Sequence, residues 1–209
     1  SRYASPDTTF VLCILLVILF FLEFLESNDN LRQFFYIFLS GLFISTSFFI
    51  RSYMTFVPLI GLSPFLFYHL SRKDCIYNIL FLCGILVGSI PTIVNLYFSF
   101  QKFGILGITS LFDFAKRQAI GDLVSNNFFL IPFNFIYLTF PIGLILLILF
   151  TSTKINYMVK YPLLIYCYPF LSLVILLSMS TSYPHYYLFL LPSLSIIFSV
   201  FISSNSFRF

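Results

Sequence analysis

Long apolar runs restrict the fold of this chain more than any other feature. The first of them, VLCILLVILFFLEFL, follows the short polar start SRYASPDTTF. A helix rises about 1.5 Å per residue, so about 20 residues cross the roughly 30 Å hydrocarbon core of a bilayer. Hydrophobic residues make up 60% of the 209 positions and charged residues 9%, whereas soluble domains are roughly half apolar and a quarter charged. The sequence therefore predicts an integral membrane protein with no soluble domain between the runs.

Seven segments come near the length that spans a bilayer. Their apolar character does not alternate as in the strands of a membrane barrel, and backbone polar groups in lipid must be satisfied internally. We therefore expect an all-α fold, a polytopic membrane helix bundle of about seven transmembrane helices that forms a single transmembrane domain over residues 1–209. The expected helices are Thr8 to Leu25, Leu31 to Ile50, Tyr53 to Leu70, Cys75 to Phe100, Phe128 to Phe150, Tyr161 to Met179 and His185 to Ser203.

Two connections are short and one is long. ESNDN, after the first segment, has the residues of a polar turn that starts a helix, and FFIRSYMTF leaves room only for a tight turn. Residues 101–127 form the long loop, and their mixture of apolar and charged residues suits a helix that lies in the membrane interface. A loop of this length in a compact membrane protein is usually functional.

The loops alternate across the membrane, which sorts the basic residues into two sets. The short loops of one side carry only Arg2 and Arg51. Those of the other side carry six basic residues: Arg32, Arg72, Lys73, Lys154, Lys160 and Arg208. Because short cytoplasmic loops are rich in Lys and Arg, we predict that the larger set is cytoplasmic. The long loop, Asp7, Arg51 and His185 then share the extracytoplasmic face.

The sequence argues against several classes of function. Its net charge of +4 is spread over short loops without a basic block, so nucleic acid is not expected as a partner. It contains no P-loop, dinucleotide fingerprint, HExxH motif or nucleophile elbow. The cysteines lack metal-ligand spacing and are predicted to be small buried hydrophobic residues. They are Cys13, Cys75, Cys83 and Cys167.

Asp7 and Arg51 are the first two candidate site residues, and each has two interpretations. Asp7 comes one residue before the expected helix start at Thr8, where a carboxylate either caps the helix or holds a sugar hydroxyl, an amine or a metal. Arg51 interrupts an apolar stretch. It either snorkels from a helix end or binds the phosphate of an anionic lipid head group.

Further candidates lie near the same predicted face. His185, in SYPHYYLFLLP, has the chemistry of a proton carrier, a metal ligand or a donor to phosphate. Its neighbour Tyr186 is typical of an interfacial aromatic belt. Lys116 and Arg117 in the long loop are expected to anchor an interfacial helix to anionic head groups and are candidate substrate-binding residues.

Three stretches carry a resemblance to a known family. They are SRYASPD before a helix, GLFISTSFFIRSYMTFVPL two helices later, and YPHYYLFLLPSLSII near the end, and IPFNFIYLTFPIGLILL adds a fourth similarity. The chain resembles a middle to C-terminal stretch of the polyprenyl-phosphate-sugar-dependent glycosyltransferases of the GT-C class. That group includes protein mannosyltransferases, lipid A aminoarabinose transferases and rhizobial lipopolysaccharide sugar transferases.

The resemblance implies the transfer of a sugar from a polyprenyl-phosphate carrier to an extracytoplasmic lipid, glycan or protein, in a bacterial plasma membrane. Asp7 matches the second acidic position of the family and Arg51 the basic position that faces the carrier phosphate. Arg2 belongs to the same first motif, and His185 with Tyr186 matches the element beside the site. The family's chief acidic residue lies in an earlier outer loop that would precede Ser1, so an N-terminally truncated chain is expected to be inactive alone.

Membrane lipids and the lipid-linked sugar donor are the partners that this resemblance implies, and it leaves a divalent metal open. A transporter or lipid flippase is an alternative, although such proteins often show paired repeats, which this sequence lacks. An O-antigen polymerase or ligase is another, but it would carry more basic residues and a histidine in the long loop. A scaffold without activity also fits a chain that lacks the first outer loop.

Overall fold

The computed structural model describes residues 6–110, 161, 163–178, 188, 190–192 and 194–195. Every secondary-structure element in these residues is helical, which confirms the predicted all-α class for this part of the chain. The chain groups into two compact units, one of Ser1–Leu59 and Leu66–Arg117 and one of Ile60–Phe65 and Gln118–Phe209. A single transmembrane domain over residues 1–209 stays a prediction.

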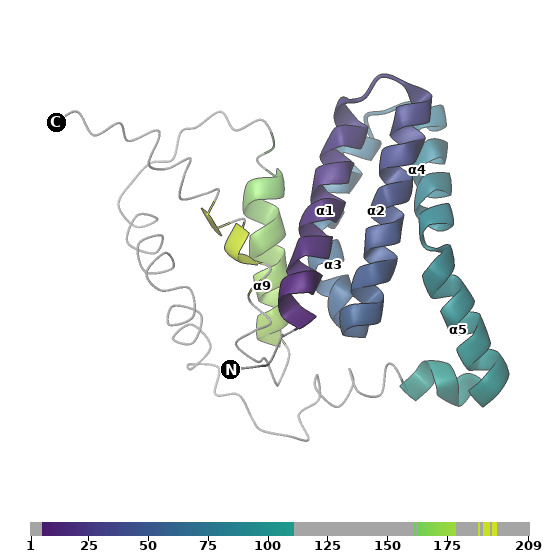
Figure 1. Ribbon diagram of the computed structural model, residues 1–209. Helices are drawn as coiled ribbons and strands as arrows, with labels where there is room; N and C mark the ends of the chain where they lie inside the picture. Colours follow the sequence, from purple (N-terminus) through teal and green to yellow (C-terminus); the bar gives the residue numbers. More distant parts are fainter. Residues whose placement is uncertain are drawn as a thin grey trace. The chain divides into compact units, whose positions relative to one another are not determined.

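The first unit contains the helices of the first four predicted segments, except residues 60–65 of α3 (Figure 1). Their bounds lie within a few residues of the predicted ones, except at the break in the fourth segment, because charged or polar turns bracket the apolar runs. The elements are α1 (Pro6–Glu26), α2 (Asn30–Arg51), the 3-10 turn η1 (Ser52–Thr55), α3 (Phe56–Leu70), α4 (Cys75–Gly88) and α5 (Ile90–Phe103).

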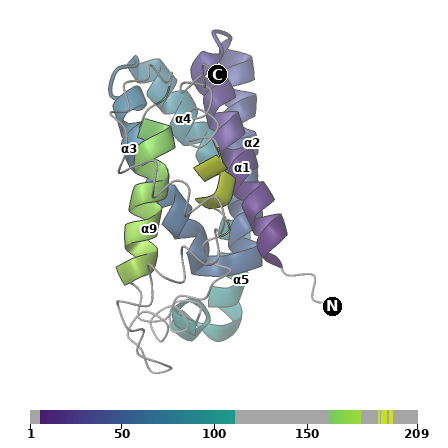
Figure 2. The same ribbon diagram turned by 90° about the vertical axis from the view of Figure 1, so that its left-hand side faces the viewer.

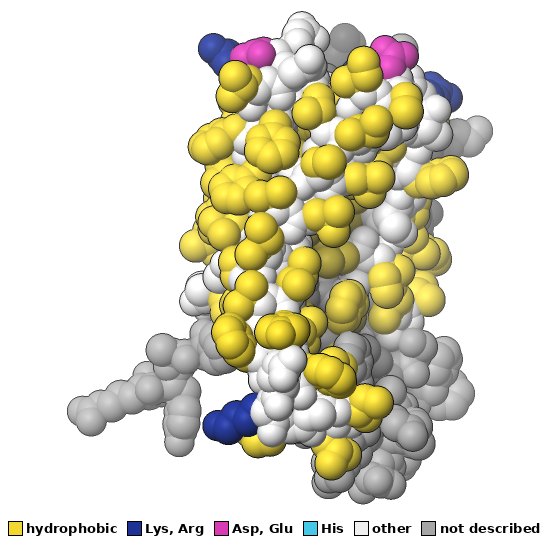
Figure 3. Space-filling model, turned by 90° about the vertical axis from the view of Figure 1, so that its right-hand side faces the viewer, with side chains coloured by type: hydrophobic (Ala, Val, Ile, Leu, Met, Phe, Trp, Pro, Cys, Tyr) yellow, Lys and Arg dark blue, Asp and Glu magenta, His cyan; other side chains and the backbone are white. Residues whose placement is uncertain are grey.

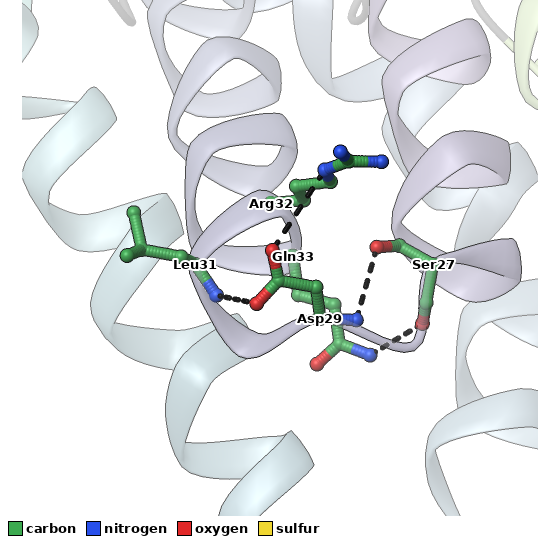
Figure 4. Close-up of polar contacts among 5 residues, drawn as sticks. All are labelled: Ser27, Asp29, Leu31, Arg32 and Gln33. Carbon is green, nitrogen blue, oxygen red and sulfur yellow. Dashed lines mark hydrogen bonds and ion pairs between the residues drawn. The ribbon is translucent and has the colours of Figure 1, made fainter.

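The ESNDN turn between α1 and α2 starts a helix, as predicted. Asp29 is the N-cap of α2, and its Oδ1 accepts a hydrogen bond from the backbone N–H of Leu31 at 3.2 Å. The side-chain amide of Gln33 donates to the carbonyl oxygen of Ser27 at 2.6 Å (Figure 4). These bonds satisfy polar groups that a helix end leaves without intrahelical partners.

Contacts at the two ends of the first unit define the directions of its helices. At one end, the first turn of α1 meets the last turn of α2 through Asp7 and Arg51. At the other, the rings of Phe24 in α1 and Tyr77 in α4 lie 4.3 Å apart. The helices α1 and α2 are therefore antiparallel (Figures 1 and 2), and α3 returns the chain from the Asp7 end to the Tyr77 end.

Small residues bring α2 and α4 into backbone contact. A Cβ added to Gly88 would lie 2.3 Å from the carbonyl oxygen of Phe38 and 2.8 Å from Cα of Gly41. The hydroxyl of Ser45 donates to the carbonyl oxygen of Gly88 at 3.3 Å. Close approach of this kind is how helices associate in lipid, where dispersion and interhelical hydrogen bonds replace the hydrophobic effect.

The predicted helix Cys75 to Phe100 is broken, which corrects the sequence-based expectation. The axes of α4 and α5 differ by 51°, and the break falls at Ser89, two residues before Pro91. Proline lacks the N–H that would bond four residues back, and its ring clashes with the preceding turn. The helix α5 then extends to Phe103, beyond the predicted end.

The beginning of the predicted long loop is also helical. Gly104, with a φ of 61°, ends α5, and residues 105–110 form a further helical stretch whose direction differs from that of α5 (Figure 1). Ile105 and Leu106 are 70% and 75% exposed, and a position of this stretch in the membrane interface stays a prediction. Residues 111–127 of the predicted loop lie outside the described part of the chain.

Two helical stretches of the described chain are long and apolar enough to cross a membrane, Asp7–Glu26 and Asn30–Leu70. The second contains the reversal at η1. The bent pair Cys75–Gly88 and Ile90–Phe103 is a third if it counts as one span. Hydrophobic side chains cover most of the face that carries α4 and α5, and the charged ones in that view lie toward its two ends (Figure 3). Seven spans stay a prediction.

The second unit is described through residues 60–65 of α3, the π-helical turn η2 (Leu163–Cys167) and α9 (Tyr168–Ser178), of which Figure 2 shows α9 clearly. The last two confirm a helix within the predicted segment Tyr161 to Met179. Tyr168, Ser172 and Leu176 are buried along one face of α9, and a Cβ at Gly61 would lie 2.1 Å from the hydroxyl oxygen of Ser172. The predicted helix Phe128 to Phe150 lies outside the described residues.

Candidate functional site

Asp7 and Arg51 form an ion pair, although 44 residues separate them in the sequence. Nη2 of Arg51 donates a hydrogen bond to Oδ1 of Asp7. Asp7 lies in the first turn of α1, where the helix dipole favours an anion, and Arg51 lies in the last turn of α2, where it favours a cation. The antiparallel arrangement of the two helices brings these complementary ends together.

The pair is largely removed from solvent. The side chain of Asp7 is 6% exposed and that of Arg51 is 22% exposed. The ion pair between Arg32 and Asp29 at the Tyr77 end is different, because its side chains are 75% and 60% exposed. Burial makes a charge costly unless it is paired and hydrogen-bonded, so Asp7 and Arg51 depend on each other far more than Asp29 and Arg32 do.

This geometry corrects the expected start of the first helix. The helix α1 starts at Pro6, so Asp7 lies inside the first turn and not before it, and proline at the start of a helix is favourable because its missing N–H would be unsatisfied there. The guanidinium of Arg51 contacts a buried carboxylate, and both interpretations of Arg51, snorkelling and phosphate binding, stay predictions.

The η1 turn positions Arg51. The next residue, Ser52, has a φ of 44°, and among the described residues it is the one non-glycine residue with a positive φ. Its N–H bonds to the carbonyl oxygen of Phe48 and closes α2. Such a backbone conformation costs on the order of 1–3 kcal/mol and persists only where surrounding packing maintains it. Tyr53 and Met54, which are buried, supply that packing.

Thr55 is a polar residue of this region that the sequence did not single out. It is 1% exposed, and its Oγ1 has no hydrogen-bond partner within the described chain. A buried hydroxyl normally has a partner. The signal in the sequence was weak, because one threonine in an apolar stretch is common in membrane helices.

The other predicted site residues lie outside the described residues. They are Arg2, Lys116, Arg117, His185 and Tyr186. Of the candidate set, the structure therefore locates Asp7 and Arg51 and brings these two into contact. Their roles in binding or catalysis stay predictions, as does the shared face with His185 and the long loop.

No group of three or more His, Cys, Asp or Glu side chains in the described residues is arranged to hold a metal ion. The cysteines follow the sequence-based expectation only in part. Cys13 is buried, but Cys75 and Cys83 are exposed. Exposure of a small apolar side chain is unremarkable on a helix that faces lipid.

At the end of the α1–α2 pair, the guanidinium of Arg51 is held by the buried carboxylate of Asp7. A guanidinium in this setting suits a phosphate oxygen, because it presents several donors in a plane. Comparisons of the chain with protein-family models, with curated proteins and with solved structures find no match.

Proposed function

We propose that this chain forms part of a membrane glycosyltransferase, which moves a sugar from a polyprenyl-phosphate carrier to an acceptor outside the plasma membrane of a bacterium. The observation that carries the proposal is the buried pair of Asp7 and Arg51 at one end of the α1–α2 hairpin. Transfer from such a carrier requires a cation that stabilises the departing lipid phosphate. Arg51 is a cation at the edge of two helices that are apolar enough to lie in lipid.

In this proposal the two residues have different roles. Arg51 binds the phosphate of the carrier as charge builds on its oxygens during departure of the lipid. Asp7 is a positioning residue, because its carboxylate accepts a hydrogen bond from Nη2 and fixes the orientation of the guanidinium. Membrane lipids surround the bundle, and the lipid-linked sugar is the donor substrate.

Binding of undecaprenyl phosphate to the full-length protein in lipid nanodiscs tests the proposal. Arg51→Gln removes the charge and is expected to weaken binding at least tenfold, since charge-assisted hydrogen bonds to phosphate are strong. Arg51→Lys keeps the charge without the planar donors and is expected to retain part of the affinity. Arg32→Gln is the matched control, because Arg32 lies at the opposite end in an exposed pair. Equal binding by Arg51→Gln and Arg32→Gln would contradict the proposal.

A lipid-linked-sugar transporter is the second candidate, and the break between α4 and α5 favours it. Helices interrupted inside the membrane are common in transporters, where their ends contact substrate. Two assays on the same proteoliposomes separate the candidates. The transferase moves radiolabelled sugar onto an acceptor, whereas the transporter makes lipid-linked sugar added on one side accessible on the other without breaking the glycosidic bond.

A further inference from the structure

Two basic side chains in the turn between α3 and α4 have no carboxylate partner in the described residues. This turn, residues 71–74, is called the α3–α4 turn, and its cations Arg72 and Lys73 are both exposed. Salt bridges in the described residues engage Arg32 and Arg51, whereas neither cation of the turn forms one. The α3–α4 turn therefore presents two adjacent positive charges that no ion pair of the described chain engages.

A tyrosine ring contacts each of these cations. The guanidinium carbon Cζ of Arg72 lies 4.0 Å from the ring centroid of Tyr68, and Nζ of Lys73 lies 4.9 Å from the ring centroid of Tyr77. Both distances are those of cation–π interactions. Such contacts restrict the conformations of a long side chain, which otherwise loses much freedom when it binds a ligand, and they leave its charge in place. Both charges are therefore held at defined positions.

The backbone and the rings that hold the two cations are fixed by further bonds. The N–H groups of Arg72 and Lys73 bond to carbonyl oxygens in the last turn of α3, at 3.3 and 3.2 Å. The carbonyl end of a helix also favours cations through its dipole. Tyr77 is 7% exposed, and its hydroxyl donates a hydrogen bond to the carbonyl oxygen of Phe24 at 3.3 Å. The positions of the cations thus follow from the packing of α1, α3 and α4.

The α3–α4 turn joins two apolar helices at the Tyr77 end. The helix α3 completes the apolar stretch Asn30–Leu70, and α4 begins the bent pair. Phe67 and Ile76, on either side of the turn, are 76% and 67% exposed. At this end of the face that carries α4 and α5, charged side chains border the hydrophobic band (Figure 3). Because tyrosine and basic side chains at such a border lie at the level of lipid head groups, the two cations are placed where lipid phosphates are.

We propose that Arg72 and Lys73 bind a phospholipid whose head group carries a net negative charge, in the leaflet at the Tyr77 end. Guanidinium and ammonium groups donate charge-assisted hydrogen bonds to phosphate oxygens. A zwitterionic lipid binds less well, because its own cationic group is repelled by two adjacent cations. The acyl chains of the bound lipid lie along Phe67 and Ile76. Asp74 follows Lys73 directly, and its negative charge limits the affinity for an anion.

Quenching of tryptophan fluorescence by brominated lipid tests the site. The 209 residues contain no tryptophan, so Phe67→Trp places a reporter beside the turn, and any tryptophan outside them is replaced by phenylalanine in the full-length protein. Phe35→Trp is the matched control, because Phe35 is 53% exposed and lies one helical turn from Arg32, whose charge is paired. Each protein is reconstituted in phosphatidylcholine bilayers that contain phosphatidylglycerol. Bromine is carried by the acyl chains of one lipid or of the other, at equal mole fraction of the brominated species.

The preference for phosphatidylglycerol over phosphatidylcholine follows from the two quenching curves. We expect a preference of about fivefold at Phe67→Trp and below about twofold at Phe35→Trp, as the attraction of a basic side chain for anionic lipid predicts. Arg72→Gln combined with Lys73→Gln should lower the preference at Phe67→Trp to that of the control, whereas Arg72→Lys should largely retain it. A preference below about twofold at Phe67→Trp, or one that persists in the double glutamine variant, would overturn the proposal.

A soluble anion is the other ligand that two cations could take. Glycerol 1-phosphate carries the phosphate without acyl chains, so adding it to the solution should leave the quenching at Phe67→Trp unchanged. Displacement of the brominated phosphatidylglycerol by glycerol 1-phosphate would refute a lipid site. Because both cations are exposed, the double glutamine variant should unfold in an SDS titration at the midpoint of the parent. The inference does not depend on the proposed sugar transfer, since Arg51 lies at the opposite end of α2.

Discussion

Replacing Gly88 by alanine tests whether backbone contact holds α4 against α2. The added Cβ would lie 2.3 Å from the carbonyl oxygen of Phe38 and 2.8 Å from Cα of Gly41. Both atoms belong to the backbone of α2, so no side-chain rotation relieves the overlap. The helices have to separate by about 1 Å before ordinary van der Waals contact is restored.

The expected cost follows from three contributions. Overpacking of a close contact costs about 1–3 kcal/mol. Separation also lengthens the hydrogen bond from Ser45 to the Gly88 carbonyl, 3.3 Å in the structure, and loses about 0.6 kcal/mol. Alanine recovers about 1 kcal/mol because it favours helix more than glycine does. We therefore expect Gly88→Ala to lower the free energy of unfolding by about 0.6–2.6 kcal/mol.

The free energy of unfolding is measured by SDS titration in mixed micelles with circular dichroism as the readout. Val87→Ala is the control, because Val87 is 40% exposed and adjacent, and its change should stay within about 0.5 kcal/mol. At Gly84 the closest atom to an added Cβ is Cγ2 of Ile37, at 1.9 Å. Ile37→Ala should therefore partly compensate Gly84→Ala but not Gly88→Ala. Compensation at both glycines, or wild-type stability of Gly88→Ala, would refute the backbone-contact argument.

The remaining predictions use the same titration. Arg51→Gln leaves the carboxylate of Asp7 buried without its cation and should cost about 3 kcal/mol. Asp7→Asn should cost less, because the side chain of Arg51 is 22% exposed and that of Asp7 is 6% exposed. Equal costs for the two variants would contradict this. Ser172→Ala removes a buried hydroxyl that has no partner in the described chain and should stabilise the protein by about 1 kcal/mol, whereas destabilisation would reveal a hydrogen bond. Asp29→Ala removes the cap of α2 and should cost about 1 kcal/mol, while Arg32→Gln should leave the midpoint unchanged because its ion pair is exposed.

The sequence predicted the helices of the first unit well because polar turns separate their apolar runs. ESNDN and the residues from Ser71 to Asp74 interrupt hydrophobicity sharply, so α1, α2 and α3 end close to the expected positions. At Ser89 no charged or polar turn interrupts the apolar run. It lies with Pro91 inside a continuous apolar run, and composition does not distinguish a proline that a membrane helix tolerates from one that breaks it.

The candidate site was predictable as a set of residues but not as a pair. Asp7 and Arg51 stand out because each is charged at the edge of an apolar run. Their contact depends on the antiparallel packing of α1 and α2. The sequence does not show this packing, because the two residues are 44 positions apart. Gly84 and Gly88 carried a readable signal for close helix packing in their spacing of four, yet that spacing does not identify α2 as the partner.

The two helices of the bent segment, α4 and α5, differ in how closely they pack against the other helices. The backbone of α2 contacts α4 at Gly88 and the side chain of Ile37 contacts it at Gly84, whereas α5 has no buried residue. Ser89, which joins α4 and α5, is therefore the point about which the angle between the two helices would change. We therefore expect a change in bilayer thickness to alter the 51° angle at Ser89 before it disturbs the contact between α2 and α4.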